Sequence, residues 1–340
     1  MERKNIWLHR FALATAGATF LLIIAGGLVT STDSGLAVPD WPLSYGQVMP
    51  PMVGGIFYEH GHRMVATFVG LLTTVLAIWL WRKEERRWVK MLGLVALLAV
   101  ITQGVLGGIT VLLLLPTWVS TTHATLAQSF FSLTIVLAII TSPSWKAHVP
   151  LDFGRMTKTR SLAVATTAAV LLQLILGALM RHSGAGLAIP DFPLSYSHWL
   201  PPTSADQIAS LNEYRLVYYD LAPVELSQIW IHFVHRLGAL LVTILVLMNV
   251  VHVLRNFTIP QMREPAIIQG LLVLVQILLG ALTVWTGKGV QVATAHVAVG
   301  ALLLGTSVAL TVYSFGWFTL PVRKSAASFV PSPVTAEGGA

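Results

Sequence analysis

Apolar segments of about 20 residues recur along this chain of 340 residues, and a helix of that length crosses the hydrocarbon core of a membrane. Hydrophobic residues make up 55% of the sequence and charged residues only 10%, whereas soluble domains have about 25% charged residues. So few charges cannot cover a surface that faces water. We therefore predict an all-α membrane protein with eight transmembrane helices, near 11–31, 58–81, 91–115, 119–141, 162–181, 229–254, 267–287 and 290–314.

The basic residues predict how these helices are oriented. Most of the 21 Lys and Arg residues fall in the N-terminal segment, in the predicted loops 82–90, 142–161 and 255–266, and in the tail. The exceptions are Arg63, Arg181, Arg215, Arg236 and Lys288. Basic residues concentrate in cytoplasmic loops, so we predict a multi-pass protein of the plasma membrane with both termini in the cytoplasm. The net charge of +7 then reflects orientation among membrane lipids and does not indicate nucleic-acid binding.

The two halves of the chain repeat one another. Residues 26–45 read GGLVTSTDSGLAVPDWPLSY, and residues 177–196 read GALMRHSGAGLAIPDFPLSY, at an offset of 151. Each repeat contains four helices, so the repeats share one orientation. We predict two duplicated four-helix bundles related by a pseudo-two-fold axis along the membrane normal. Further along the chain the offset is 173, and it relates His62-Arg63 to His235-Arg236, Gln103 to Gln276, Gly107 to Gly280 and His123 to His296.

The repeat divides the chain into an N-terminal half, residues 1–150, a C-terminal half, residues 151–320, and a tail, 321–340. The tail is rich in Ser, Pro, Ala and Gly, a composition that predicts disorder. The change of offset places an insertion of 22 residues around 203–228, in the second outer loop. Its sequence, which includes Tyr214, Tyr218 and Tyr219, suggests an outer helix or cap.

Four histidines occupy equivalent places on the second, fourth, sixth and eighth predicted helices. These helices all run inward, and each histidine lies roughly 4–7 residues past the helix start. At 1.5 Å per residue, the four therefore share one depth near the outer surface. Two histidines that face each other on neighbouring helices can ligate a haem iron from both sides, and a small residue four positions later leaves room for the ring. The histidines are His62, His123, His235 and His296, and the small residues are Ala66, Ala127, Ala239 and Gly300.

Simpler interpretations compete with haem ligation. A lone histidine near a membrane interface is more often a packing or hydrogen-bonding residue, and small residues usually mark helix crossings. The recurrence of residue type, depth and repeat position in all four favours haem. Zinc and copper fit less well, because each half offers two histidines and few acids, and the chain has no cysteine. The lack of cysteine also excludes disulfides and iron–sulfur clusters.

The two halves differ at one position beside the histidines. Glu59 precedes His62 by three residues on the same helix face, and its repeat counterpart is His232. A carboxylate beside a haem can take protons during an oxidation, and an intramembrane carboxylate is costly without a function. We therefore predict that Glu59 is catalytic and that the N-terminal half is the reactive one. The alternative is that Glu59 only pairs with Arg63 or a loop residue.

Three further residues lie beside the histidines. Arg63 and Arg236 directly follow the first histidine of each half. They are candidates for two-pronged bonds to haem propionates, or else arginines that reach for the interface. His232 lies three residues before His235 and either supports that ligand or lies in interfacial water.

These features together resemble the haem A synthase family. The resemblance covers residues 10–315 and implies an oxidoreductase that converts haem O to haem A. Such an enzyme oxidises a ring methyl to a formyl group by successive hydroxylations, for terminal oxidase biogenesis. The residues that carry it are the Glu59-x-x-His62-Arg63 stretch, His123, the His235-Arg236 pair, His296 and the Gly-Leu-x-x-Pro-Asp-x-Pro-Leu loop.

By the same resemblance, His235 and His296 ligate the iron of a permanent haem b, and His62 and His123 hold the substrate haem beside Glu59. The implied partners are haem O as the substrate, haem O synthase, oxidase assembly proteins and an electron acceptor that the sequence does not identify. Some members carry a cysteine pair in an outer loop. This chain has no cysteine, so a thiol-dependent step does not apply to it.

Two other functions stay open on the residues alone. A duplicated bis-histidine cytochrome b would carry electrons without catalysis, although a carboxylate in only one half favours an enzyme. A haem-free transporter or assembly factor is the second alternative, because duplicated membrane folds often transport. The lack of charged residues deep in the predicted helices argues against transport.

Overall fold

The computed structural model describes residues 3–146, 156–204 and 206–316. Within these residues, eight helices are long and apolar enough to cross a membrane, as predicted. They are α1 Arg3–Ser31, α2 Gly54–Lys83, α3 Arg87–Leu112, α4 Thr117–Thr141, α6 Met156–His182, α8 Leu226–Asn256, α9 Pro260–Trp285 and α10 Val290–Gly316. The shorter helices are α5 Pro143–Lys146, the 3-10 helix η2 Ala185–Leu187, and α7 Asp206–Tyr219, which is the helix expected in the insertion.

The helix ends differ from the predicted ones for local reasons. Most helices continue past their apolar segments into polar residues; α9, for example, begins at Pro260 and not near 267. Helix α3 also begins earlier than predicted, but it ends three residues earlier, at Leu112. Leu114 and Leu115 adopt positive φ angles of 59° and 60°, and the proline at 116 disfavours helical geometry in the residue before it.

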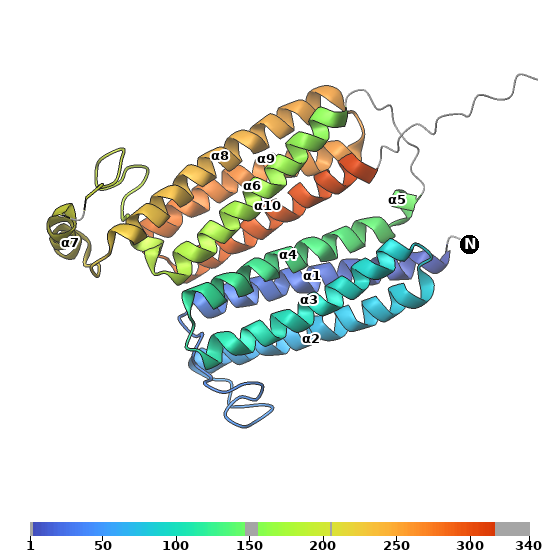
Figure 1. The fold of residues 1–340 in the computed structure, drawn as a ribbon, viewed down its shortest axis with the longest axis horizontal. Coiled ribbons are helices and arrows are strands. Elements are labelled where there is room, and N and C mark those ends of the chain that lie inside the picture. Colours follow the sequence, from blue (N-terminus) through green and yellow to red (C-terminus); the bar gives the residue numbers. More distant parts are fainter. Residues whose placement is uncertain (1–2, 147–155, 205, 317–340) are drawn as a thin grey trace, which may run out of the picture.

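The eight long helices form two bundles of four (Figure 1). In the first bundle, α1 and α3 each contact both α2 and α4; in the second, α6 and α9 each contact both α8 and α10. The bundles meet where α1 contacts α10, α4 contacts α6, and α4 contacts α10. Exchanging the two bundles reproduces this contact pattern, as a duplication requires. The pseudo-two-fold axis itself stays a prediction.

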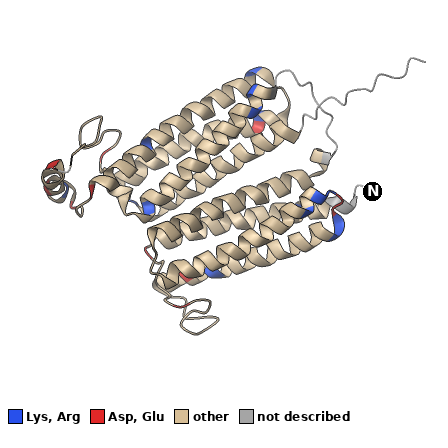
Figure 2. Cartoon of the chain, viewed as in Figure 1, with Lys and Arg blue, Asp and Glu red and all other residues tan. Residues whose placement is uncertain are grey.

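The two ends of the molecule differ in charge and in loops. Helix α1 begins and α10 ends at one end, where Lys and Arg residues gather (Figure 2); we call it the basic end. The long segments between α1 and α2 and between α6 and α8 lie at the other end with α7 (Figure 1); we call it the loop end. The predicted tail, residues 321–340, lies outside the described residues.

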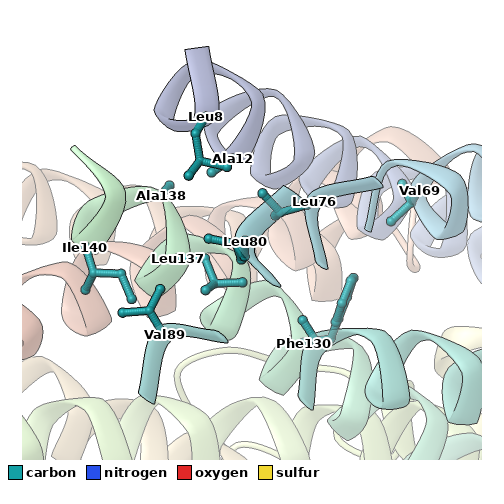
Figure 3. Packing of buried hydrophobic residues seen from close by; sticks show 11 residues of the cluster. Leu8, Ala12, Val69, Leu76, Leu80, Val89, Phe130, Leu137, Ala138 and Ile140 are labelled. Carbon is teal, nitrogen blue, oxygen red and sulfur yellow. The ribbon is translucent and has the colours of Figure 1, made fainter. Parts of the chain in front are cut away.

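A hydrophobic cluster drawn from α1, α2, α3 and α4 packs the interior of the first bundle (Figure 3). Small residues such as Ala12 and Ala96 let the helices approach closely, and large ones such as Leu76 fill the space between them. The cluster reaches Val69, which is two helical turns from His62. A large group inside this bundle therefore has its room nearer to the loop end.

The second bundle has a chain of polar side chains at the equivalent depth. Asn249 Nδ2 donates to Gln269 Oε1 over 3.3 Å, and Gln269 Nε2 donates to Ser307 Oγ over 2.6 Å. All three residues are at most 1% exposed, so these bonds join α8, α9 and α10 inside the membrane. These three neutral residues were not predicted, because the prediction from sequence concerned only charged residues deep in the helices. Their repeat counterparts in the first bundle are Leu76, Ala96 and Thr134.

Candidate functional site

Each of the four predicted histidines packs its ring against a glycine of a neighbouring helix. A Cβ atom added to that glycine would lie only 3.1–3.3 Å from the ring Cε1, which is closer than the ordinary contact of about 3.5–4.0 Å between carbon atoms. A larger residue than glycine would therefore force the ring to shift by a few tenths of an ångström. The pairs are His62 with Gly26, His123 with Gly107, His235 with Gly177, and His296 with Gly280.

Each bundle holds two of the four histidines, and that the two face each other stays a prediction. His62 on α2 and His123 on α4 belong to helices that lie diagonally across the first bundle, and His235 on α8 and His296 on α10 do the same in the second. A flat group between the members of a pair would therefore occupy the centre of its bundle.

Equivalent glutamines support the second histidine of each pair. Gln103 Nε2 donates to the backbone carbonyl of His123 over 2.9 Å, and Gln276 Nε2 donates to that of His296 over 3.0 Å. Because both glutamines come from the helix that also supplies the ring-packing glycine, ring and backbone are held by the same neighbour. The offset of 173 between Gln103 and Gln276 is visible in the sequence. The hydrogen bonds that the two glutamines form are seen only in the structure.

A third glutamine breaks the symmetry. Gln173 Nε2 donates to the backbone carbonyl of His235 over 2.8 Å and lies 3.1 Å from its Nδ1. The repeat counterpart of Gln173 is Leu22, which has no hydrogen-bonding group. The second bundle thus has a polar side chain beside its first histidine where the first bundle has a hydrocarbon.

The donor set fits haem better than a bare metal ion. Each bundle presents two imidazoles on diagonally placed helices, which is the number that an iron with two axial histidines needs. In the part of the chain that the structure describes, no group of three or more His, Cys, Asp or Glu residues could hold a metal ion. The buried polar atoms without a partner among the described residues include the Nδ1 atoms of His62, His123 and His296.

Glu59 is buried and forms two hydrogen bonds. Its Oε1 accepts from Arg63 Nη2 over 2.6 Å, and its Oε2 accepts from the backbone N–H of Val38 over 2.8 Å. These are the arginine and loop contacts that the sequence analysis gave as the alternative to catalysis. The carboxylate also lies about one turn before His62 on α2, so a catalytic role for Glu59 stays a prediction.

His232 takes the place of Glu59 in the second bundle. It is 3% exposed, and its Nδ1 accepts a hydrogen bond from the backbone N–H of Ile189 over 3.3 Å. Ile189 is the repeat counterpart of Val38, so a carboxylate and an imidazole fill the same structural position. A supporting role of His232 toward His235 stays a prediction.

Arg63 and Arg236 hold the two repeated loops. Arg63 donates to the carbonyls of Val38, Asp40 and Leu43 at 2.7–3.1 Å. Arg236 donates to the three equivalent carbonyls at 2.7–3.2 Å, which belong to Ile189, Asp191 and Leu194. Both arginines therefore use their Nη donors on loop carbonyls, and propionate binding stays a prediction. In Arg236 the Nε is buried without a partner among the described residues.

The Pro-Asp-x-Pro-Leu-Ser-Tyr motif folds the loops into the shape that these arginines bind. Asp40 accepts from the backbone N–H groups of Tyr45 and Gly46 at 2.7 and 2.8 Å, and Tyr45 donates its hydroxyl to the carbonyl of Ala37. The hydrogen bonds from Gly46 and Tyr45 lower the pKa of the Asp40 carboxyl. The equivalent contacts of Asp191 recur in the second loop.

Helix α7 covers the second loop through Arg215 and through Ile208 and Leu211, which pack against the buried apolar cluster of that loop. Arg215 is 2% exposed and donates to the carbonyls of Leu187, Ala188 and Ala222 at 2.9–3.1 Å. It also donates to the hydroxyl of Tyr196, whose pKa is raised by burial. The insertion is therefore a cap fixed over the loop of the second bundle.

A cleft of about 490 Å³ opens between the bundles, lined by residues of α1, α4, α5, α9 and α10. Of these, Leu302 lies six residues past His296 on α10, about 9 Å further along the helix, and Tyr313 lies deeper still. The cleft is thus nearer to the basic end than the histidines are, and it is separate from the candidate site.

The fold and the site define a class: an eight-helix membrane protein whose two bundles each carry two glycine-packed histidines on diagonally placed helices. Residues 9–308 match the family described as cytochrome oxidase assembly protein, COX15-CtaA. The chain belongs to this family, in agreement with the resemblance seen in the sequence.

Similar proteins carry a more specific name. A protein of Geobacillus kaustophilus is 27% identical over 333 residues, which is 96% of each chain. A protein of Halalkalibacterium halodurans is 29% identical over 306 residues, covering 87% of this chain and 93% of the relative. A protein of Lysinibacillus sphaericus is 28% identical over 307 residues, covering 89% of this chain and 94% of the relative. All three are named heme A synthase.

Proposed function

We propose that the chain is a haem A synthase, an oxidoreductase that oxidises a ring methyl of haem O to the formyl group of haem A for terminal oxidases. The observation that carries the proposal is the pair of glycine-packed histidines that occurs once in each bundle. Membership of the cytochrome oxidase assembly family and the names of the relatives support it.

The two bundles divide the work in this proposal. His235 and His296 would hold a resident haem b, which supplies one-electron transfer when it is bound. His62 and His123 would hold the substrate haem O. The additional glutamine beside His235 supports a permanent group in the second bundle, and the buried carboxylate of Glu59 supports chemistry in the first.

Glu59 would move a proton beside the substrate. The carboxylate lies about one turn from His62, in a site that is closed by loop 37–47 and shielded from bulk water. Arg63 holds one of its oxygens and the N–H of Val38 holds the other, so the group is fixed in orientation before substrate arrives. A positioned acid or base contributes about 10²–10⁴-fold to a rate.

The location follows from the charges. The basic end would face the cytoplasm with both termini, and the loop end with the four histidines would lie near the outer surface of the plasma membrane. The substrate would come from haem O synthase, the product would go to oxidase assembly proteins, and an electron acceptor of unassigned identity would take the electrons.

Acid extraction of the purified protein, followed by chromatography of the haems, tests this function. We expect haem B together with haem O, haem A or a hydroxylated intermediate. Haem B alone would support an electron-carrying cytochrome b, and a spectrum without a Soret band would support a haem-free transporter or assembly factor. Replacing His235 or His296 with alanine should remove the low-spin haem signal.

A second experiment tests the role of Glu59. We expect Glu59→Gln, which keeps an acceptor for the N–H of Val38, to retain the resident haem but to lose haem A formation by at least about 10²-fold. Tyr45→Phe is the matched control, because it loosens the same loop by removing the bond to Ala37 and leaves the carboxylate in place. Normal product yield from Glu59→Gln would contradict a catalytic role.

A further inference from the structure

One cation lies at the contact between the two bundles. Arg181, at the end of α6, reaches across to α1, where its Nη2 donates to Ser31 Oγ over 2.6 Å and to the carbonyl of Gly27 over 3.3 Å. Ser31 Oγ also accepts from Thr294 Oγ1 on α10 over 3.1 Å. Three helices from both bundles therefore meet around the guanidinium of Arg181.

This contact lies between the two histidine sites. On α1, Gly26 packs against the ring of His62, while the adjacent Gly27 faces Thr294 and Val297 on α10, with 3.4 and 3.9 Å from a Cβ position to the nearest atoms. Thr294 and Val297 flank His296. Arg181 thus binds the stretch of backbone that separates a histidine of the first bundle from a histidine of the second.

The cation belongs to the second site by its position in the repeat. Arg181 lies one turn past Gly177, which packs against the ring of His235, and the hydroxyl of Ser31 that it binds accepts from Thr294, two residues before His296. The repeat counterpart of Arg181 is Thr30, whose hydroxyl donates to the carbonyl of Gly26 on its own helix over 3.1 Å. At this equivalent position the first bundle therefore has no charge to act on its own histidines.

Other charged groups at the loop end do not remove the difference. Arg63 and Arg236 occupy equivalent positions in the two bundles, but Arg63 is paired with the carboxylate of Glu59 over 2.6 Å. His232 takes the place of that carboxylate in the second bundle, so this difference also leaves the second site the more positive. Lys288, which also lacks a basic counterpart in the first bundle, is exposed, and water screens its charge. Asp33, the acidic residue whose charge acts on Arg181, is likewise exposed.

We propose that Arg181 raises the reduction potential of the haem held by His235 and His296 and so directs electrons from the first bundle to the second. Taking up one electron changes Fe(III) to Fe(II) and lowers the positive charge of the iron by one. A fixed cation nearby favours the reduced form, and a partly buried unit charge shifts such an equilibrium by roughly tenfold. The electron comes from the oxidation proposed for the first bundle, and this inference rests on that proposed function.

Potentiometric titration of the low-spin haem in the full-length protein tests the proposal. Arg181→Gln removes the charge but keeps hydrogen-bond donors, and we expect the midpoint potential to fall by about 59 mV, the equivalent of tenfold for one electron. Arg181→Lys should stay near the wild-type potential, because the charge remains. Ser31→Ala is the matched control, since it removes the acceptor of the 2.6 Å bond and leaves the cation.

The outcomes separate this inference from the function on which it rests. An unchanged potential in Arg181→Gln, or an equal fall in Arg181→Lys or Ser31→Ala, would overturn the electrostatic role while the haem and product assays stand. If Arg181→Gln fails to fold, Thr30→Arg gives an independent measurement. It should raise the potential of the haem bound by His62 and His123, and no change there would also overturn the proposal.

Discussion

The packing of a histidine ring on glycine makes a quantitative prediction for Gly177→Ala. The new Cβ would lie 3.1 Å from His235 Cε1, and carbon atoms in ordinary contact are about 3.5–4.0 Å apart. The ring must therefore move by roughly 0.4 Å or more. Displacing a side chain from its rotamer costs about 0.5–1.5 kcal/mol, which corresponds to about two- to thirteen-fold weaker ligation of haem.

Haem retention measures this effect. The purified variant would be diluted, and the fraction of low-spin haem that stays bound would be followed by its Soret absorbance. Gly104→Ala and Gly70→Ala are matched controls, because a Cβ at either position has no atom within 4 Å. Alanine favours the helix by about 1 kcal/mol over glycine, so the controls should fold at least as well. Wild-type retention by Gly177→Ala, or an equal loss in the controls, would refute the reasoning.

Three further predictions concern the rest of the molecule. Gln269→Leu should lower the free energy of unfolding by about 1–3 kcal/mol, because it leaves the Asn249 amide buried without its partner. In denaturation experiments, the double variant Gln269→Leu/Asn249→Leu should recover part of this loss, and no recovery would contradict the pairing. Arg215→Ala should free helix α7 from the second loop, so that limited proteolysis cuts within 206–225 while the haem spectrum is unchanged. Because the pKa of the Asp40 carboxyl is lowered in the folded protein, this group should stabilise its loop above about pH 4. The stabilisation should be lost as the pH falls through the lowered value, and faster hydrogen exchange at the Tyr45 amide would measure that loss. Asp40→Asn should abolish the pH dependence.

Much of the fold could be predicted because membrane helices follow directly from apolar length. The eight segments, the helix in the insertion and the bundle membership of each helix all came from run length and from the repeat. Helix ends could not be predicted as well, since hydropathy marks the hydrocarbon core and not the last hydrogen bond; at Leu112 the backbone of the next residues ended the helix.

The repeat singled out the four candidate histidines, His62 and its three equivalents, by their shared spacing, but it did not give their contacts. Their role as haem ligands stays a prediction. The repeat did not distinguish whether Glu59 is free or paired, since the partner N–H of Val38 lies 21 residues away in a loop. Gln173 gave no signal, because it has no polar counterpart in the first bundle.

The contact between α1 and α10 joins the first transmembrane helix of the chain to the last. Thr294 and Ser31 are 263 residues apart in sequence and still share a hydrogen bond. During synthesis, the side of α1 that faces α10 lacks this partner until α10 has been inserted. A chain truncated before α10 would contain all four helices of the first bundle and yet lack the helix of the second bundle against which α1 packs.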